Sequence, residues 1–145
     1  MITGAPPKVW AMGMPEFLIT DLERSLAFWR DVLGFRIAYS RPEQQFVYLE
    51  HPDGAQMMMY PRDGYWEVGP MEQPFGRGVV FQVYVTDVDA HARAVSAAGL
   101  PFYVEMRERW RHWGDRQGGQ REFLVQDPDG YLVMVAQRIG ERPLP

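Results

Sequence analysis

Residue types capable of acid–base, nucleophilic or metal chemistry are few in this sequence. It contains no cysteine and three histidines, His51, His91 and His112. None is spaced with another as a metal-ligand pair, and we expect all three to be solvated, in a turn, near a helix start and in a loop respectively. The sequence also lacks a Gly-x-Ser-x-Gly turn and a phosphate-binding glycine loop. It therefore offers no obvious nucleophile, thiolate or phosphate site.

Two polar residues stand out within otherwise apolar segments. Glu16 lies four residues before Thr20, and Gln82 lies four residues before Thr86. A polar group on a buried strand is destabilising unless it is hydrogen-bonded, so this matched pair suggests a surface that meets ligand, water or a partner subunit. The alternative is that Glu16 pairs with an arginine and Gln82 bonds backbone across a subunit interface.

Large aromatic side chains occur in two polar segments. Trp66 follows Tyr65 in the Pro- and Gly-rich segment 61–77, and Trp110 and Trp113 lie in "RERWRHWGDRQGG". Indoles stack on rings and attract cations, at about 0.5 to 2 kcal/mol per contact. We expect Trp110 and Trp113 to contact a ligand or to form a lid. Trp66 is equally well explained by docking onto a neighbouring subunit or by capping the core.

These residues are positioned by elements that occur twice. "FLITDLERSLAFWRDVLGF" and "FQVYVTDVDAHARAVSAAGLPF" share a short apolar strand, Thr-Asp, a helix and a glycine. Thr20 and Thr86 are the expected helix caps, and Gly34 and Gly99 are expected to end the helices in the left-handed conformation. Internal repeats indicate a duplicated structural unit.

Each helix is followed by three strand-like runs, so each copy has the order strand, helix, strand, strand, strand. A Pro-Asp-Gly turn joins the last two runs in both copies, as "HPDG" and "DPDG". The Thr-Asp pairs lie 66 residues apart and the Pro-Asp-Gly turns 76 apart, which indicates an insertion of about ten residues in the second copy. We place it in "RERWRHWGDRQGG". The expected strands cover residues 35–39, 45–50, 56–60, 102–106, 121–126 and 131–137.

The doubled unit, with "TDLERSLAFWRDVLGF" and "QDPDGYLVMVAQ", resembles the vicinal oxygen chelate superfamily, which includes glyoxalase I, extradiol dioxygenases and bleomycin resistance proteins. The resemblance covers roughly residues 14–138 and implies an α+β fold. Two tandem βαβββ modules would form a curled, cup-shaped mixed sheet with helices on the outer face. We expect one domain over 1–145, with module 1 at about 14–60, a linker at 61–77 and module 2 at about 78–138.

In metal-dependent relatives, the resemblance implies ligands on the first and last strands of each module. Here those positions carry Met14, Val80, Met134 and either Met58 or Tyr60. Alternation along a strand places Met58 and Tyr60 on the same face, so both stay open. Divalent cations prefer imidazole and carboxylate ligands, whereas thioethers suit soft ions such as Cu(I). We therefore expect no metal and no other cofactor. The opposite faces would be core, at Met57, Met59, Val133 and Val135.

The expected function is metal-free binding of a small molecule, with most resemblance to the bleomycin resistance proteins. A formal charge of -4 favours neutral or cationic ligands over nucleic acid. The ligand would be a bulky, cationic aromatic antibiotic or a related compound, bound by a cytoplasmic homodimer with no membrane partner. The alternative is a lyase, isomerase or dioxygenase in which Glu16 acts as a base. The expected ligand-binding residues are Glu16, Met58, Tyr60, Gln82, Trp110, Trp113 and Met134.

Overall fold

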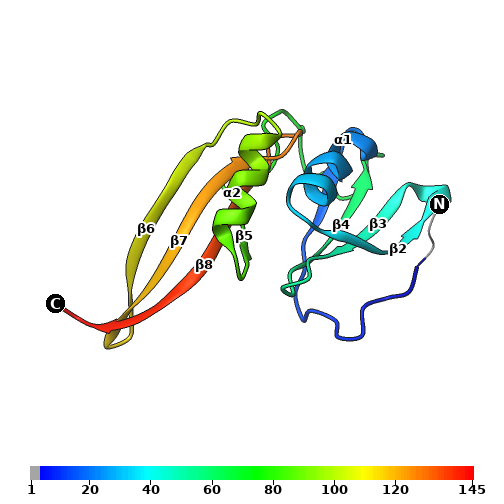
Figure 1. The fold of residues 1–145 in the computed structure, drawn as a ribbon. Coiled ribbons are helices and arrows are strands. Elements are labelled where there is room, and N and C mark those ends of the chain that lie inside the picture. The colour runs from blue at the N-terminus through cyan, green and yellow to red at the C-terminus, as the bar shows by residue number, and fades with distance from the viewer. Residues whose placement is uncertain (1–3) are drawn as a thin grey trace. The chain divides into compact units, whose positions relative to one another are not determined.

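A computed structural model describes residues 4–145, which form twelve elements (Figure 1). The first half contains β1 (Glu16–Ile19), α1 (Leu22–Leu26), the π-helical segment η1 (Ala27–Val32), β2 (Arg36–Arg41), the short 3-10 helix η2 (Pro42–Gln44), β3 (Phe46–Glu50) and β4 (Gln56–Pro61). The second half contains β5 (Val80–Tyr84), α2 (Val88–Ala97), β6 (Val104–Trp113), β7 (Arg116–Gln126) and β8 (Leu132–Pro143).

The strands form two four-stranded mixed sheets with the same topology. Their strand orders are β1-β4-β3-β2 and β5-β8-β7-β6, and in each sheet the first strand is parallel to the last while the other pairs are antiparallel. The chain divides into two compact units, one ending at Phe75 but including Asp127–Gly130, and the other formed by Gly76–Gln126 and Tyr131–Pro145. The α+β fold of two βαβββ modules is confirmed.

Each helix covers one face of its sheet, and apolar alternation supplies that face. In the first unit, the ring of Phe17 on β1 stacks on Trp29 of η1 at 5.6 Å between centroids. The four residues expected in the core, Met57, Met59, Val133 and Val135, are all buried. Their strand neighbours therefore point to the opposite, helix-free face, which we call the open face of each sheet.

The helix caps differ from those expected at Thr20 and Thr86. Asp21 caps α1 by accepting a hydrogen bond from Arg24 N at 2.9 Å, and Asp87 caps α2 by accepting one from Ala90 N at 3.0 Å. In each Thr-Asp pair, the carboxylate is therefore the cap, one residue later than expected. A carboxylate there also interacts favourably with the positive end of the helix dipole.

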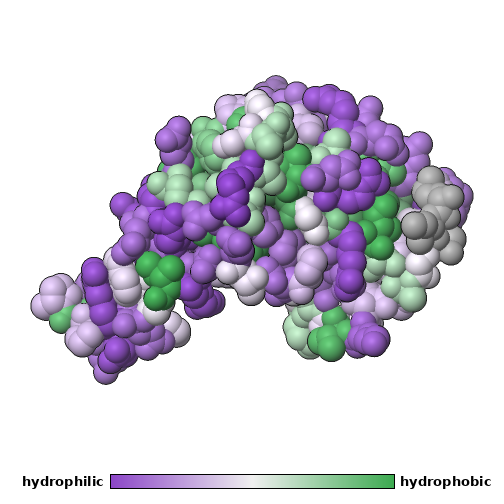
Figure 2. All heavy atoms as spheres, viewed as in Figure 1, coloured by the Kyte–Doolittle hydropathy of each residue, from purple (hydrophilic) through white to green (hydrophobic). Residues whose placement is uncertain are grey.

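The segment "RERWRHWGDRQGG" is not an irregular insertion. It forms the long ends of β6 and β7, which pair from Val104↔Leu124 as far as Trp113↔Arg116 around a two-residue turn. Gly114 in that turn has φ +61. These strand ends are largely exposed and lack apolar alternation, so sequence patterning alone indicated a loop. The far end of this hairpin, at the lower left of Figure 1, is covered mostly by hydrophilic residues (Figure 2).

The Asp127–Gly130 turn between β7 and β8 belongs to the first unit. Asp127 Oδ2 accepts a hydrogen bond from Trp29 Nε1 at 3.1 Å, and Asp129 accepts bonds from Thr20 Oγ1 at 2.6 Å and from Thr20 N at 3.0 Å. Gly130 has φ +95, and a Cβ there would lie 2.4 Å from Pro74 Cβ. Only glycine permits both the positive φ and this close approach.

Within residues 4–145, no helix is long and apolar enough to cross a membrane.

Candidate functional site

The open face of the first sheet brings together three of the expected site residues. Glu16 on β1 pairs in register with Met58 on β4, and Leu18 pairs with Tyr60. Alternate residues of a strand share a face, so Glu16, Met58 and Tyr60 all lie on the side opposite the helix. The pairing of β1 with β4 thus brings Glu16 close to Met58 and Tyr60, which lie more than forty residues away in the sequence.

A pocket of about 340 Å³ opens on this side of the first unit. Its lining includes Glu16 and Tyr60 together with Tyr65 and Trp66 from the loop after β4. Arg41 and Gln44, which the sequence did not single out, complete the lining. One carboxylate and three aromatic side chains therefore surround a cavity of the size that suits a ring of a small molecule.

The loop that carries the two pocket aromatics is held by a network of hydrogen bonds. Glu67 accepts bonds from Arg62 at 2.6 Å and from Gly64 N at 2.7 Å, and Asp63 accepts one from Tyr65 N at 2.9 Å. Tyr65 and Trp66 stay exposed, Trp66 at 70%. Trp66 also has φ +61, which is costly for a residue with a large side chain. Such strain clusters at ligand sites.

Tyr60 and Asp63 form a tight pair beside the pocket. The hydroxyl of Tyr60 donates to Asp63 Oδ2 at 2.5 Å. This bond raises the pKa of Tyr60 and lowers the pKa of the Asp63 carboxyl, and Glu16 adds a smaller electrostatic contribution to the rise at Tyr60. Tyr60 is therefore held neutral and pointed by Asp63, which suits a binding surface rather than a proton donor.

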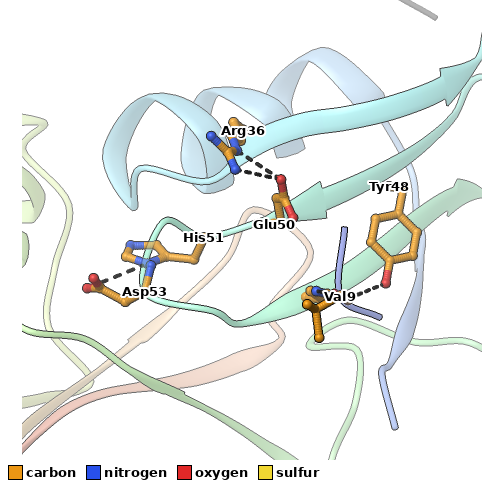
Figure 3. Close-up of polar contacts among 7 residues, drawn as sticks. Val9, Arg36, Tyr48, Glu50, His51 and Asp53 are labelled. Atoms are coloured by element: carbon orange, nitrogen blue, oxygen red, sulfur yellow. Dashed lines mark hydrogen bonds and ion pairs between the residues drawn. The ribbon is translucent and has the colours of Figure 1, made fainter. Parts of the chain in front are cut away.

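The rest of the first open face is covered by the chain before β1. Gln56 Nε2 donates to Val9 O at 2.7 Å, and the hydroxyl of Tyr48 lies 2.6 Å from Gln56 Oε1 and 2.9 Å from the sulfur of Met14. Figure 3 shows Tyr48 directed toward the segment that carries Val9. The ring of Trp10 packs edge-on against Tyr48 at 5.2 Å. Burial raises the pKa of Tyr48, so its hydroxyl stays protonated and serves packing.

The second sheet repeats the arrangement with different polar chemistry. Gln82 on β5 pairs with Met134 on β8, as Glu16 pairs with Met58. This register makes Met58, rather than Tyr60, the equivalent of Met134. Gln120 Nε2 donates to the sulfur of Met134 at 3.6 Å, so the thioether is already engaged. Gln82 itself is exposed in the chain.

Trp110 and Trp113 lie on opposite faces of the second sheet rather than in one lid. Trp110 pairs with Gly119 and shares the helix side with Arg121, which forms an ion pair with Asp89 of α2. Its ring lies against Gly119, where a Cβ would come within 2.7 Å of it. The guanidinium carbon of Arg142 also lies over this ring, 4.1 Å from its centroid. Trp113 lies on the open face. Gly118 and Gly119 follow the two tryptophans in the sequence, and each leaves space for one indole ring to lie against the strand.

The histidines do not all behave as expected. His91 lies near the start of α2, as expected, whereas His112 lies on β6 and not in a loop. His51 is buried rather than solvated, and its Nδ1 accepts a hydrogen bond from Asp53 N at 3.0 Å. Figure 3 shows this turn beside the Arg36–Glu50 ion pair. In the matching turn, Asp127 Oδ1 accepts from Asp129 N at the same distance, so His51 is a turn-forming residue.

A divalent metal does not fit the residues at the superfamily's ligand positions. Met14, Met58, Val80 and Met134 provide only thioethers and an aliphatic side chain, and Tyr60 donates its hydrogen to Asp63. Across residues 4–145, no group of three or more His, Cys, Asp or Glu side chains is placed to hold a metal ion. Hard cations require several such ligands.

Comparison with known proteins places the fold in one superfamily. The model of the Glyoxalase/Bleomycin resistance protein/Dioxygenase superfamily matches residues 12–135. The chain belongs to this superfamily. It is 29% identical over 120 residues to "Lactoylglutathione lyase" of Haemophilus influenzae, covering 79% of this chain and 83% of that protein.

Two solved structures are also similar. A superfamily member from Vibrio splendidus 12B01 is 35% identical, covering 86% of this chain and 95% of its own, with a TM-score of 0.37. Virulence protein STM3117 from Salmonella typhimurium superposes with a TM-score of 0.66 at 17% identity, covering 90% and 98% of the two chains. The second match supports the fold alone.

Proposed function

We propose that this protein is a metal-independent binding protein that sequesters a bulky, cationic aromatic small molecule, such as a bleomycin-type antibiotic. The observation that carries the proposal is the convergence of the Glu16 carboxylate with Tyr60, Tyr65 and Trp66 around one pocket. A carboxylate attracts a cationic group, and the indole and phenol faces stack on rings or attract the cation directly. Sequestration needs no catalytic group.

The basic residue in the pocket lining, Arg41, is compatible with a cationic ligand. Arg41 lies with its guanidinium carbon 3.8 Å from the centre of the Phe46 ring, so the cation is stacked on an aromatic face. Its flat guanidinium can in turn stack on a ligand ring. Met58 adds a flexible apolar surface on the same sheet face, which adapts to irregular ligands. Gln82 and Met134 occupy the equivalent places in the second unit.

Calorimetric titration of a bleomycin-type ligand tests the proposal. Glu16→Gln keeps the side-chain shape but removes the charge, so affinity should fall, and the loss should shrink as salt is added. Trp66→Ala should weaken binding by about 1 to 3 kcal/mol. Glu23→Gln is the matched control because it removes one charge from an exposed position on α1. Trp110→Ala and Trp113→Ala test the remaining tryptophans.

The outcomes are distinct. If the unmodified protein shows neither heat nor thermal stabilisation with such ligands, the sequestration proposal fails. If it binds but Glu16→Gln and Trp66→Ala bind equally well, the pocket assignment fails while sequestration stands.

A lyase, isomerase or dioxygenase activity is the second candidate function. Its support is the 29% identity to a protein named lactoylglutathione lyase. The exposed carboxylate of Glu16 would then serve as a base on a small metabolite. Elemental analysis of the purified protein separates the two candidates, because about one metal ion per chain would favour the enzyme and overturn the metal-independent proposal.

A further inference from the structure

A second pocket lies on the open face of the other unit, and its lining includes two arginines, Arg111 and Arg138. Alternation along β6 places Arg107, Arg109 and Arg111 on the side that faces away from α2, because the adjacent Glu108 pairs with Arg121 on the helix side. A cavity of about 260 Å³ opens there toward the hairpin end, lined by Arg111, Trp113, Gln120, Arg138 and other residues of the hairpin. This cavity shares no lining residue with the Glu16 pocket on which the proposed function rests.

Arg111 is held in place from below by a buried carboxylate. Its Nη2 lies 2.7 Å from Oε1 of Glu122, which is fully buried, while the Arg111 side chain is 47% exposed. Arg107 Nη2 lies 3.8 Å from the other oxygen of Glu122, an oxygen without a hydrogen-bond partner among the described residues. A buried charge is strongly destabilising unless it is paired. Glu122 therefore fixes the arginines that stand over it.

Arg138 is fixed by a different contact. Its guanidinium carbon lies 4.4 Å from the centre of the Tyr84 ring. The hydroxyl of Tyr84 is in turn 3.3 Å from Gln120 Oε1, and Gln120 pairs in register with Arg138. Arg111 on β6 and Arg138 on β8 thus flank β7 from its two sides. Each is anchored through one part of the guanidinium, and the remaining N–H groups are available to a ligand.

The Trp113 ring packs over a glycine of β7. A Cβ on Gly118, on the open face, would come within 2.9 Å of that ring, so only glycine lets the indole lie this close to the strand. Trp113 is 56% exposed and stands as one wall. The acidic lining residue, Glu141, is 3.2 Å from Arg116, which offsets its charge.

We propose that this pocket binds a small molecule in which a carboxylate is attached to an aromatic ring. The planar forks of Arg111 and Arg138 match a planar carboxylate, which accepts paired hydrogen bonds from a guanidinium. The exposed face of Trp113 stacks on the adjoining ring. The site lies within one unit and does not rest on the proposed function of the other pocket.

The test uses 2-naphthoate as the probe and follows the backbone amides by two-dimensional NMR. Saturable shifts should appear at Gly118, Gly119 and Gly140, all of which line the pocket. The charge-reversed 2-naphthylmethylammonium ion and inorganic phosphate should shift them far less. Equal shifts with phosphate would mean a site for any anion, and equal shifts with the ammonium ion would mean an apolar surface; either result overturns the proposal.

Variants then assign the residues. Arg111→Gln and Arg138→Gln should each raise the Kd for 2-naphthoate about tenfold, as expected for loss of a charged hydrogen bond. The matched control, Arg93→Gln, removes the same charge from an exposed position on α2 of the same unit and should leave the Kd unchanged. An equal loss in Arg93→Gln would show a general charge effect and sink the assignment.

Glu122→Gln separates positioning from simple electrostatics. Removing a negative charge near an anion site should tighten binding if charge alone matters. We expect weaker binding, because Arg111 loses its charged anchor. A melting curve shows whether this buried substitution folds, and the two arginine variants test the site independently if it does not. Tighter binding in a folded Glu122→Gln protein would overturn the positioning role.

Discussion

At the scale of single residues, equivalent positions in the two units carry different chemistry. Glu16 and Gln82 stand opposite Met58 and Met134 in the same register. The sulfur atoms replace the hard ligands that a divalent ion needs, and the polar partners differ by one charge. A duplicated framework thus provides one anion-bearing and one neutral position.

The Tyr60–Asp63 pair gives a prediction about pH. Tyr60→Phe removes the hydrogen bond that chiefly lowers the pKa of the Asp63 carboxyl, so that pKa should rise. NMR titration of the side-chain carboxyl carbons measures it. Tyr103→Phe, at an exposed position in the other unit, is the control. An unchanged Asp63 pKa in Tyr60→Phe would contradict the pairing.

The sign of the stability effect follows from the same shift. The folded pKa of Asp63 lies below its unfolded value, so its contribution to stability is present above the unfolded pKa. It is lost as the pH falls through the folded pKa. The part of the stability difference between the unmodified protein and Tyr60→Phe that comes from this shift should therefore vanish in acid.

Part of the site could be predicted from sequence at this scale. Glu16, Met58 and Tyr60 could be predicted to lie together, because alternation along a strand fixes which of its residues share a face. Trp66 and Arg41 were not, since they reach the pocket through a loop and through the end of β2. Arg111 could not be placed either, because the charged residues and tryptophans around it show no apolar alternation that would indicate which face it occupies.

At the scale of elements, the β6–β7 hairpin depends on Trp110 more than on Trp113. Trp110 covers Gly119, stacks on Arg142 and donates to Glu108 at 2.7 Å. Trp110→Ala should lower the free energy of unfolding by about 1 to 2 kcal/mol. Trp113→Ala should cost less, as Trp113 is more exposed. Denaturant titration followed by circular dichroism compares them, and a larger loss in Trp113→Ala would refute this ranking.

The Asp127–Gly130 turn gives a second prediction for an element. Asp129 is buried and accepts hydrogen bonds from Thr20 and from Gln73 Nε2 at 3.0 Å. Asp129→Ala should destabilise the protein by roughly 2 to 4 kcal/mol, because Thr20 and Gln73 together lose three hydrogen bonds to a charged acceptor. Asp53→Ala changes the equivalent, exposed residue of the first turn and should cost much less. Equal losses in a thermal melt would show that the turn residue matters only locally.

The elements themselves were largely predictable. Both turns and both helix ends follow from glycines that adopt positive φ: Gly34, Gly54, Gly99 and Gly130. The caps were displaced by one residue because a carboxylate outcompeted the neighbouring hydroxyl, and Thr20 is instead used by Asp129. That bond joins residues 109 positions apart, and no local pattern specifies such a pairing.

At the scale of the whole molecule, we expect a homodimer. Both sheets have open edges, and apolar side chains including Val79, Val80 and Tyr103 are exposed. Exposed edges and apolar patches commonly mark interfaces. Light scattering should give twice 16.8 kDa. A particle of the single-chain mass at micromolar concentration would rule the dimer out.

Metal addition is also a whole-molecule test. A ligand that binds only the native state raises the melting temperature by mass action. Zinc, nickel, manganese and iron ions should each leave the melting temperature unchanged, since the candidate positions carry methionine and valine. Saturable stabilisation by one of them, lost in Glu16→Ala, would reverse this conclusion.

The Asp127–Gly130 turn, which packs with the first unit although it lies late in the sequence, has a consequence for synthesis. A chain that has emerged only as far as Phe75 has every helix and strand of the first unit, yet its Trp29 indole and Thr20 hydroxyl have no Asp127 or Asp129 to bond. At 5–20 residues per second, the ribosome takes roughly 3 to 11 seconds to extend the chain from Phe75 to Gly130. The first unit is therefore synthesised first but lacks these hydrogen bonds until the Asp127–Gly130 turn has been made, near the end of the chain.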